Sequence, residues 1–134
     1  MSRNFNWPVR VYYEDTDAGG VVFYANYLKF YERSRTEMLR EMGFEQDELI
    51  AQESVIFVVR SVQVDYLKPA KFNNMLDVSA QLSLVKSASL TFEQTIVCEN
   101  ELLSKAVIRI ACLDSTTMRP KLIPDLLKQA LSHD

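Results

Sequence analysis

The chain has 134 residues, of which 48% are hydrophobic and 25% are charged, with a formal net charge of -3. This length and apolar content suit one domain with its own core, so residues 1–134 are expected to fold as a single unit. The acidic balance excludes a global positive field, so nucleic acid is not an expected partner and any anionic ligand needs local basic residues. No apolar run reaches transmembrane length, so we expect no integral membrane segment and a cytoplasmic protein.

The N-terminal part of the chain predicts a strand followed by a long helix. Apolar residues occupy the odd positions from Trp7 to Tyr13, which is the period of a half-buried strand. Beyond a glycine pair, apolar side chains recur at three- and four-residue steps, which predicts an amphipathic helix from about residue 24 to 42, with Gly43 as its stop. The apolar stripe of that helix consists of Tyr24, Tyr27, Leu28, Tyr31, Met38, Leu39 and Met42.

The rest of the chain predicts mostly strands. Four segments alternate or are rich in β-branched residues, and short polar links between them favour antiparallel hairpins: 54–66, 75–85, 88–98 and 102–114. A last segment adds an edge piece and a C-terminal helix with Pro124 near its first turn. The order of elements predicts an α+β domain with one antiparallel sheet, whose open edges favour pairing with a second copy of the chain.

Cysteine and histidine usage limits the chemistry. Cys98 and Cys112 lie in apolar strand patterns, where free cysteine behaves as a small buried hydrophobe, so a disulfide is the weaker interpretation. His133 is the only histidine and lies one residue from the C-terminus, which leaves little room for a histidine triad or a histidine-rich metal site. We therefore expect no metal or redox cofactor.

The stretch "EDTDAGGVVFYANY", residues 14–27, indicates a functional site. It places Glu14, Asp15 and Asp17 together directly before a glycine pair and the predicted helix. Neighbouring carboxylates repel one another and glycines cost backbone entropy, so folding alone is a poor reason for this composition. The alternative is that Asp17 only turns or caps the chain as it enters the helix, as aspartate often does.

This stretch carries the motif D-x-D-x-x-G-x-V followed by a helix. Together with "WPVRVYYEDTDAGGVVFYANYLKFYERSRTEML" and "FVVRSVQVDYLKPAKFNNML", it resembles the 4-hydroxybenzoyl-CoA thioesterase family. The resemblance is closest to the acyl-CoA thioesterase branch associated with the bacterial Tol-Pal envelope system, and runs from about Trp7 to Pro124. It implies a hot-dog fold, in which a curved antiparallel sheet wraps around one long helix. It also implies a homodimer with active sites at the subunit interface, often assembled further into a homotetramer.

The resemblance implies an acyl-CoA thioesterase that hydrolyses an acyl-CoA thioester to the free carboxylic acid and CoA. Coenzyme A then enters as part of the substrate, and no separate cofactor is implied. The family's catalytic aspartate maps onto Asp17, as base or nucleophile. Most of the Tol-Pal-associated branch has histidine where this chain has Tyr24, and the 4-hydroxybenzoyl-CoA enzyme has tyrosine there. The departure therefore bears on substrate choice and on any histidine-assisted step.

Thioester hydrolysis needs a base or nucleophile and preorganised donors for the carbonyl oxygen. The donors expected here are backbone N–H groups around Val22, Phe23 and Tyr24, at the positive end of the helix dipole, with Gly20 leaving room for the substrate. The side chain of Tyr24 either lines the acyl pocket and positions the thioester or is one more aromatic of the helix stripe.

Asp15 has two interpretations of its own. It either raises the pKa of Asp17 by like-charge repulsion or is a solvated loop acid, and the second is the simpler one.

The phosphates of CoA need basic side chains outside the pocket. Arg60 interrupts the apolar phase of its strand, so it either extends to the rim or meets a phosphate. The other candidates are Lys86, Arg119 and Lys121, with Lys68 and Lys71 behind them.

Two rival functions fit the same pattern. One is a module that binds an acyl thioester or an acyl carrier protein without cleaving it, although an acidic carrier protein would need a local basic patch. The other is a dehydratase or hydratase of the same fold, which would require a histidine in the pocket.

Overall fold

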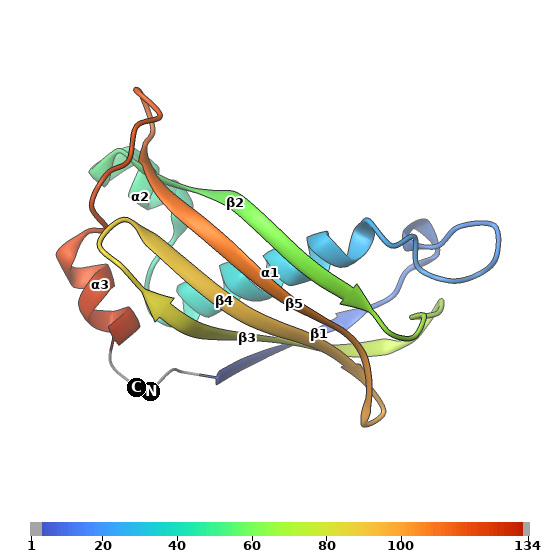
Figure 1. Ribbon diagram of the computed structural model, residues 1–134. Helices are drawn as coiled ribbons and strands as arrows, with labels where there is room; N and C mark the ends of the chain where they lie inside the picture. The colour runs from blue at the N-terminus through green and yellow to red at the C-terminus, as the bar shows by residue number, and fades with distance from the viewer. Residues whose placement is uncertain (1–3, 133–134) are drawn as a thin grey trace.

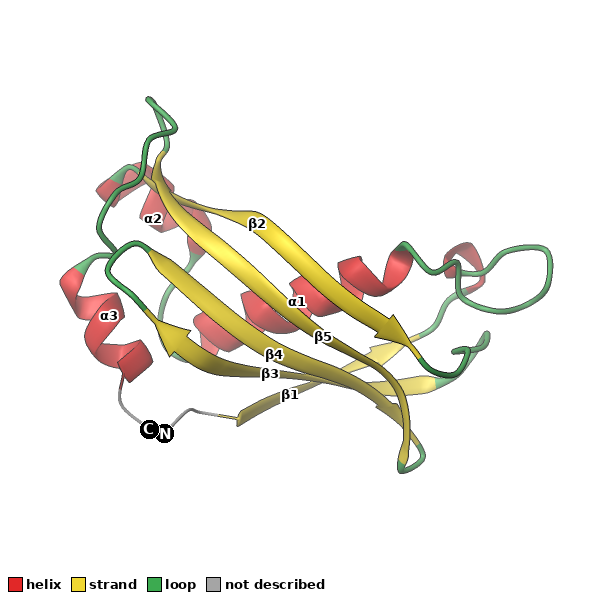
Figure 2. Ribbon diagram, viewed as in Figure 1, coloured by secondary structure: helices red, strands yellow, loops and turns green. Residues whose placement is uncertain are grey.

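The computed structural model describes residues 4–132 and consists of one curved antiparallel sheet with a long helix against one face (Figure 1). The strand order in the sheet is β1-β3-β4-β5-β2. Figure 2 shows that α2 and α3 lie at one end of the sheet, whereas the loop before the long helix, which includes the short helix η1, lies at the other. The elements are β1 (Asn4–Arg10), η1 (Tyr13–Asp15), α1 (Asn26–Glu41), α2 (Gln46–Glu53), β2 (Val55–Tyr66), β3 (Met75–Val85), β4 (Ser89–Cys98), β5 (Glu101–Asp114) and α3 (Asp125–Ser132).

The topology places β1 and β2 at opposite edges of the sheet, although they are consecutive strands in the chain. Hairpins join β3, β4 and β5, while β1 pairs with β3 and β2 pairs with β5, all antiparallel. The chain between β1 and β2 therefore crosses the face of the sheet, and α1 is the segment that makes this crossing. The α+β class and the single antiparallel sheet predicted from the sequence are confirmed.

The core forms where α1 meets the alternating residues of the sheet. Every second residue of β3 from Leu76 to Leu82 is buried, as the alternation predicts. Leu84 is exposed because the pairing of β3 with β4 shifts register between Leu82 and Leu84. From α1, the side chains of Phe30, Tyr31 and Met38 are fully buried against this face.

The N-terminal strand differs from its prediction. It runs from Asn4 to Arg10, and the chain then leaves the sheet for the η1 turn. Val9 and Val11 are buried as expected, whereas Trp7 and Tyr13 are exposed. The period-two pattern was therefore correct for the valines, whereas Trp7, whose ring stacks with Phe5, and Tyr13 are only partly covered by the rest of the chain.

Two features of the helical part also differ from the sequence-based prediction. Helix α1 begins at Asn26, so Tyr24 precedes the helix, is 61% exposed and does not belong to the buried stripe. The sequence pattern did not indicate α2, because its eight residues bury only Leu49 and show no apolar period. Ser54 ends α2 in the left-handed conformation and leads directly into β2.

The expected state of the cysteines is confirmed, since Cys98 and Cys112 are buried free thiols. Burial raises the pKa of the Cys112 thiol. His133 lies outside the described residues. Across residues 4–132, no cluster of three or more histidine, cysteine or acidic side chains is arranged to hold a metal ion. Within the same range, no helix has the length and apolarity needed to cross a membrane.

Candidate active site

The loop between β1 and α1 is fixed at one end of the sheet by the segment before β3. The Val22 N–H donates to the Ala70 carbonyl at 2.8 Å, and the Val11 N–H donates to the Asn74 carbonyl at 2.9 Å. The Asn73 N–H returns a bond of 3.0 Å to the Val11 carbonyl. These backbone bonds hold the acidic stretch in one conformation beside the start of α1.

Asp17 lies exposed within this loop, with one carboxylate oxygen engaged. Its Oδ1 accepts a hydrogen bond of 2.9 Å from the Gly19 N–H, so Asp17 does turn the chain, as the structural alternative expected. No hydrogen bond to Oδ2 comes from any residue the structure describes, which leaves that oxygen open to a reactant. Gly20 follows with φ of +79°, a conformation that favours glycine.

Asp15 has a structural role that neither of its two interpretations from the sequence included. Its side chain accepts a hydrogen bond of 2.8 Å from the Tyr12 N–H. Its carbonyl accepts from the Phe23 N–H at 3.0 Å and from Asn26 Nδ2 at 2.9 Å. Asp15 therefore links the end of the first strand to the start of α1, and its carboxylate is committed to the backbone.

The backbone donors at the start of α1 are not all those expected. The N–H groups of Val22 and Phe23 are engaged with backbone carbonyls, so they are unavailable to a substrate. Within residues 4–132, the N–H groups of Tyr24 and Ala25 have no partner, and Ala25 is the N-cap of α1. The expected donor region is thus shifted by one to two residues toward the helix.

An aromatic cluster surrounds these donors. The ring of Tyr24 lies 5.8 Å from that of Tyr66 and 4.9 Å from that of Phe23. Tyr66 also packs edge-on against Tyr27 at 5.2 Å. Tyr27 is buried, accepts a hydrogen bond of 2.9 Å from the Ala70 N–H, and has a raised pKa because of its burial.

Tyr66 was not identified from the sequence. It ends a strand that the apolar pattern did predict, but the pattern gives no sign that the end of this strand meets α1. The cluster places the side chain of Tyr24 beside the donors and outside the core, which favours its pocket-lining interpretation.

Three of the basic candidates for CoA phosphates lie away from Asp17. Lys86 follows the last residue of β3. The Ile123 N–H, two residues after Lys121, donates to the Ser87 carbonyl, so Lys121 lies at the same end of the sheet. Asp17 lies near the start of β3, and the 11 residues of that strand separate the two ends by roughly 35 Å, at about 3.3 Å per residue. Within one chain, Lys86, Arg119 and Lys121 are therefore not brought together with Asp17.

The remaining basic candidates lie closer. Arg60 is exposed on the edge strand β2, at the register shift between Val59 and Ser61. Lys68 is paired with Glu101, whereas Lys71 is exposed and forms a bridge with Val21 of the acidic loop. Lys71, a secondary candidate from the sequence, is thus the lysine placed beside the loop.

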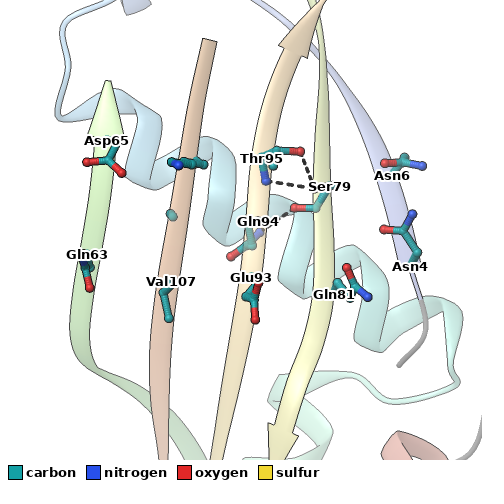
Figure 3. A pocket seen from close by; sticks show the side chains of 12 residues that line it. Asn4, Asn6, Gln63, Asp65, Ser79, Gln81, Glu93, Gln94, Thr95 and Val107 are labelled. Atoms are coloured by element: carbon teal, nitrogen blue, oxygen red, sulfur yellow. Dashed lines mark hydrogen bonds between the residues drawn. The ribbon is translucent and has the colours of Figure 1, made fainter. Parts of the chain in front are cut away.

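A broad hollow of about 610 Å³ occupies the face of the sheet opposite α1 (Figure 3). Its lining is polar and includes Gln63, Asp65, Ser79 and Thr95, and Ser79 and Thr95 are hydrogen-bonded to each other at 2.7 Å. This hollow contains no residue of the acidic loop. The arrangement of Asp17, free amides and aromatic rings therefore defines the candidate site, although the loop is open in one chain.

A curved antiparallel sheet around one long helix, with an aspartate-glycine loop before that helix, defines a hot-dog thioesterase. The sequence model described as thioesterase-like superfamily matches residues 11–131, and the chain belongs to this family.

Relatives and a solved structure agree with this assignment. The chain is 44% identical to the acyl-CoA thioesterase YbgC of Haemophilus influenzae, over 99% of this chain and 98% of the relative. It is 50% identical to the acyl-CoA thioester hydrolase YbgC of Escherichia coli O6:H1, over 90% of each chain. A probable thioesterase from Bartonella henselae superposes with a TM-score of 0.87 at 34% identity, over 91% of this chain and 100% of that one. The family, fold and enzyme class expected from the sequence are confirmed.

Proposed function

We propose that the chain hydrolyses acyl-CoA at the loop between β1 and α1, with Asp17 as the base or nucleophile. The observation that carries this proposal is the Asp17 Oδ2 atom, which accepts no hydrogen bond from residues 4–132, in a loop directly before the N–H groups of Tyr24 and Ala25, which have no partner in the same range. A carboxylate and backbone donors near one helix N-terminus suit a thioester carbonyl, which needs attack from one side and stabilisation of its oxygen.

The two roles of Asp17 lead to the same products. As a base, Asp17 takes a proton from water, the resulting hydroxide attacks the carbonyl carbon, and the tetrahedral intermediate expels the CoA thiolate. As a nucleophile, Asp17 bonds to the carbonyl carbon, the thiolate leaves, and water then cleaves the mixed anhydride. In both routes the amides of Tyr24 and Ala25 donate to the developing oxyanion, and the thiolate acquires a proton.

The active unit is a homodimer that pairs through the open edge of β2. This strand has no neighbour on its outer side in the described chain and exposes Val58 and Val62, while Tyr24 and Tyr66 are exposed at its end. Exposed apolar surface of this kind marks an interface, and a second copy would cover it. A homotetramer would be built from such dimers.

An antiparallel pair of β2 strands would also complete the CoA site. It places the far end of one copy beside the acidic loop of the other, so Arg119 and Lys121 of the second copy would approach Asp17. Arg60 would lie near the two-fold axis, because it occupies the middle of β2. The buried free thiols of Cys98 and Cys112 support a cytoplasmic location for this enzyme.

The test of this function is thiol release from a panel of acyl-CoAs by the wild type and by Asp17→Asn. The substitution keeps the Oδ1 bond to Gly19 and removes the negative charge, so hydrolysis is expected to fall at least a hundredfold. The matched control is Asp77→Asn, an exposed aspartate of β3, which is expected to retain activity. Activity of Asp17→Asn equal to that of the wild type would remove the catalytic role and favour the binding-module alternative.

A further inference from the structure

A small cavity of about 110 Å³ lies between the middle of α1, the start of α2 and the sheet. Its sheet side is apolar and is formed by Phe57, Leu90, Phe92 and Ile110. Its helix side includes Arg35 and Glu32. The helix side also includes the polar side chains of Thr36 and Gln46, so the Arg35 guanidinium lies between an apolar sheet wall and a polar helix wall.

Arg35 is 8% exposed and donates one hydrogen bond, from Nη1 to Gln94 Oε1 at 2.9 Å. No buried side-chain nitrogen or oxygen of the described residues lacks a hydrogen bond, so the remaining guanidinium nitrogens contact open space. The cavity lined by Arg35 is that space. Burial lowers the pKa of Arg35 to about 10, so the side chain remains a cation with free donors at neutral pH.

The charges around Arg35 favour a neutral acceptor. Glu32 lies on the same wall, raises the pKa of Arg35 through its charge, and accepts a hydrogen bond from the Thr36 hydroxyl. A ligand carboxylate in this cavity would therefore meet a second negative charge. A hydroxyl or keto oxygen can accept from the guanidinium without that repulsion.

Side chains on the α1-facing side of β2 extend from the cavity toward the candidate active site. On β2, Gln63 and Asp65 line the hollow on the opposite face of the sheet, so Val62 and Tyr66 face α1. Val59 lines the cavity at one end of this row of side chains, and Tyr66 packs against Tyr24 at the other.

The distance along α1 from its first residue to Arg35 limits the length of the ligand. Arg35 lies about 14 Å beyond the helix start at Asn26, at about 1.5 Å per residue, and long helical side chains lean back toward the N-terminus. The cavity is smaller than the roughly 150 Å³ void that binds benzene, so it holds the end of a chain and not a whole aromatic group.

We propose that this cavity receives the distal end of the acyl chain and that Arg35 selects chains carrying a hydroxyl or keto oxygen there. This inference rests on the proposed function, because it assumes that the thioester lies at the loop before α1. A plain methyl terminus would strip water from the guanidinium and offer no acceptor in return. A terminal oxygen would replace that water.

The experiment compares kcat/KM for straight-chain acyl-CoAs of short, medium and long chain with that for their terminally hydroxylated counterparts. The wild type is expected to prefer one hydroxylated chain over its plain partner by roughly ten- to a hundredfold, as for a hydrogen bond to a charged group. Arg35→Met is expected to bring the ratio of the two kcat/KM values close to one. Arg33→Met, on the exposed side of α1, removes the same charge outside the cavity and should retain the preference.

A second variant fills the cavity without changing Arg35. Val59→Phe, at a position 46% exposed, should reduce turnover of the preferred hydroxylated chain more than turnover of short acyl-CoAs. Equal values of kcat/KM of the wild type for hydroxylated and plain chains at every length would overturn the proposal. The rate ratio is measured in the wild type, so it tests the cavity even if Asp17→Asn retains activity and the proposed catalytic role fails.

Discussion

Gly19 fixes the position of the Asp17 carboxylate, both through a hydrogen bond and through close packing. The Gly19 N–H donates to Asp17 Oδ1 at 2.9 Å, and a Cβ atom built on Gly19 would lie 3.3 Å from the same oxygen. This distance is shorter than an ordinary van der Waals contact, so a side chain at Gly19 has to displace the Asp17 carboxylate by a few tenths of an ångström. The first glycine of the pair therefore fixes where the open oxygen points.

Gly19→Ala is expected to lower kcat/KM by about tenfold, because misplacement of a catalytic group by a fraction of an ångström is costly. The backbone of Gly19 lies outside the left-handed region, so the alanine causes little strain and the midpoint of thermal unfolding should stay unchanged. Steady-state kinetics and thermal unfolding of the same preparation check both expectations.

The control is Gly43→Ala. Gly43 has φ of +96°, so alanine there should destabilise the fold by about 1 kcal/mol and leave kcat/KM unchanged. If Gly19→Ala lost stability and Gly43→Ala lost activity, the assignment of the two glycines would be reversed.

Gln94 joins α1 to the sheet, and its replacement by leucine is expected to be strongly destabilising. Its side chain accepts from Arg35 and donates to the carbonyls of Tyr31 at 3.1 Å and Ser79 at 3.0 Å. Gln94→Leu keeps most of the volume and leaves a buried cation and two carbonyls without these partners. Urea unfolding should show a loss of about 2–4 kcal/mol. Gln63→Leu on the exposed face of β2 should change stability by less than about 0.5 kcal/mol, and a similar loss in both variants would contradict the role of Gln94.

The sheet could be predicted because its signal is local. Alternation along 75–85 gave the buried face of β3, and only the register shift before Leu84 departed from it. By contrast, α2 is short and mostly polar, so no periodicity marked it. The start of α1 at Asn26 depends on the loop that precedes it, which periodicity does not describe.

Only those parts of the site that depend on a single sequence motif could be predicted. Asp17 came from the motif, but the engagement of the Val22 amide depends on Ala70, a residue distant in sequence. The same holds for Tyr66, which reaches Tyr24 only because β2 ends beside α1. The sequence also gave no information on which end of the sheet carries Lys86, so its distance from Asp17 required the topology.

Val58→Lys is expected to weaken self-association and activity together. Val58 is 36% exposed on the unpaired edge strand β2, so in the proposed dimer a lysine would place its charge at the interface. Val107→Lys is the matched control, since Val107 is 37% exposed but lies on β5, between two neighbouring strands. Sedimentation should show a lower mass for Val58→Lys alone. A dimer that persists in Val58→Lys would place the interface on another surface.

Tyr31→Phe is expected to alter the pH dependence of stability at alkaline pH. Burial raises the pKa of Tyr31 above its ordinary value of 10.0, and its hydroxyl donates to Ser104 Oγ at 2.6 Å. Above about pH 10 the unfolded chain releases this proton while the folded chain retains it, so stability falls as pH rises, by up to about 1.4 kcal/mol per pH unit.

Tyr31→Phe removes this contribution, so its free energy of unfolding should fall less between about pH 9 and pH 11 than that of the wild type. At neutral pH the variant should be only about 1 kcal/mol less stable, because Ser104 still donates to the Asp65 carbonyl at 2.9 Å. Urea unfolding across this range gives both values, with Tyr13→Phe, at an exposed tyrosine, as the control. An equal loss of unfolding free energy at alkaline pH in Tyr31→Phe and in the wild type would show that the folded state does not retain the proton of Tyr31.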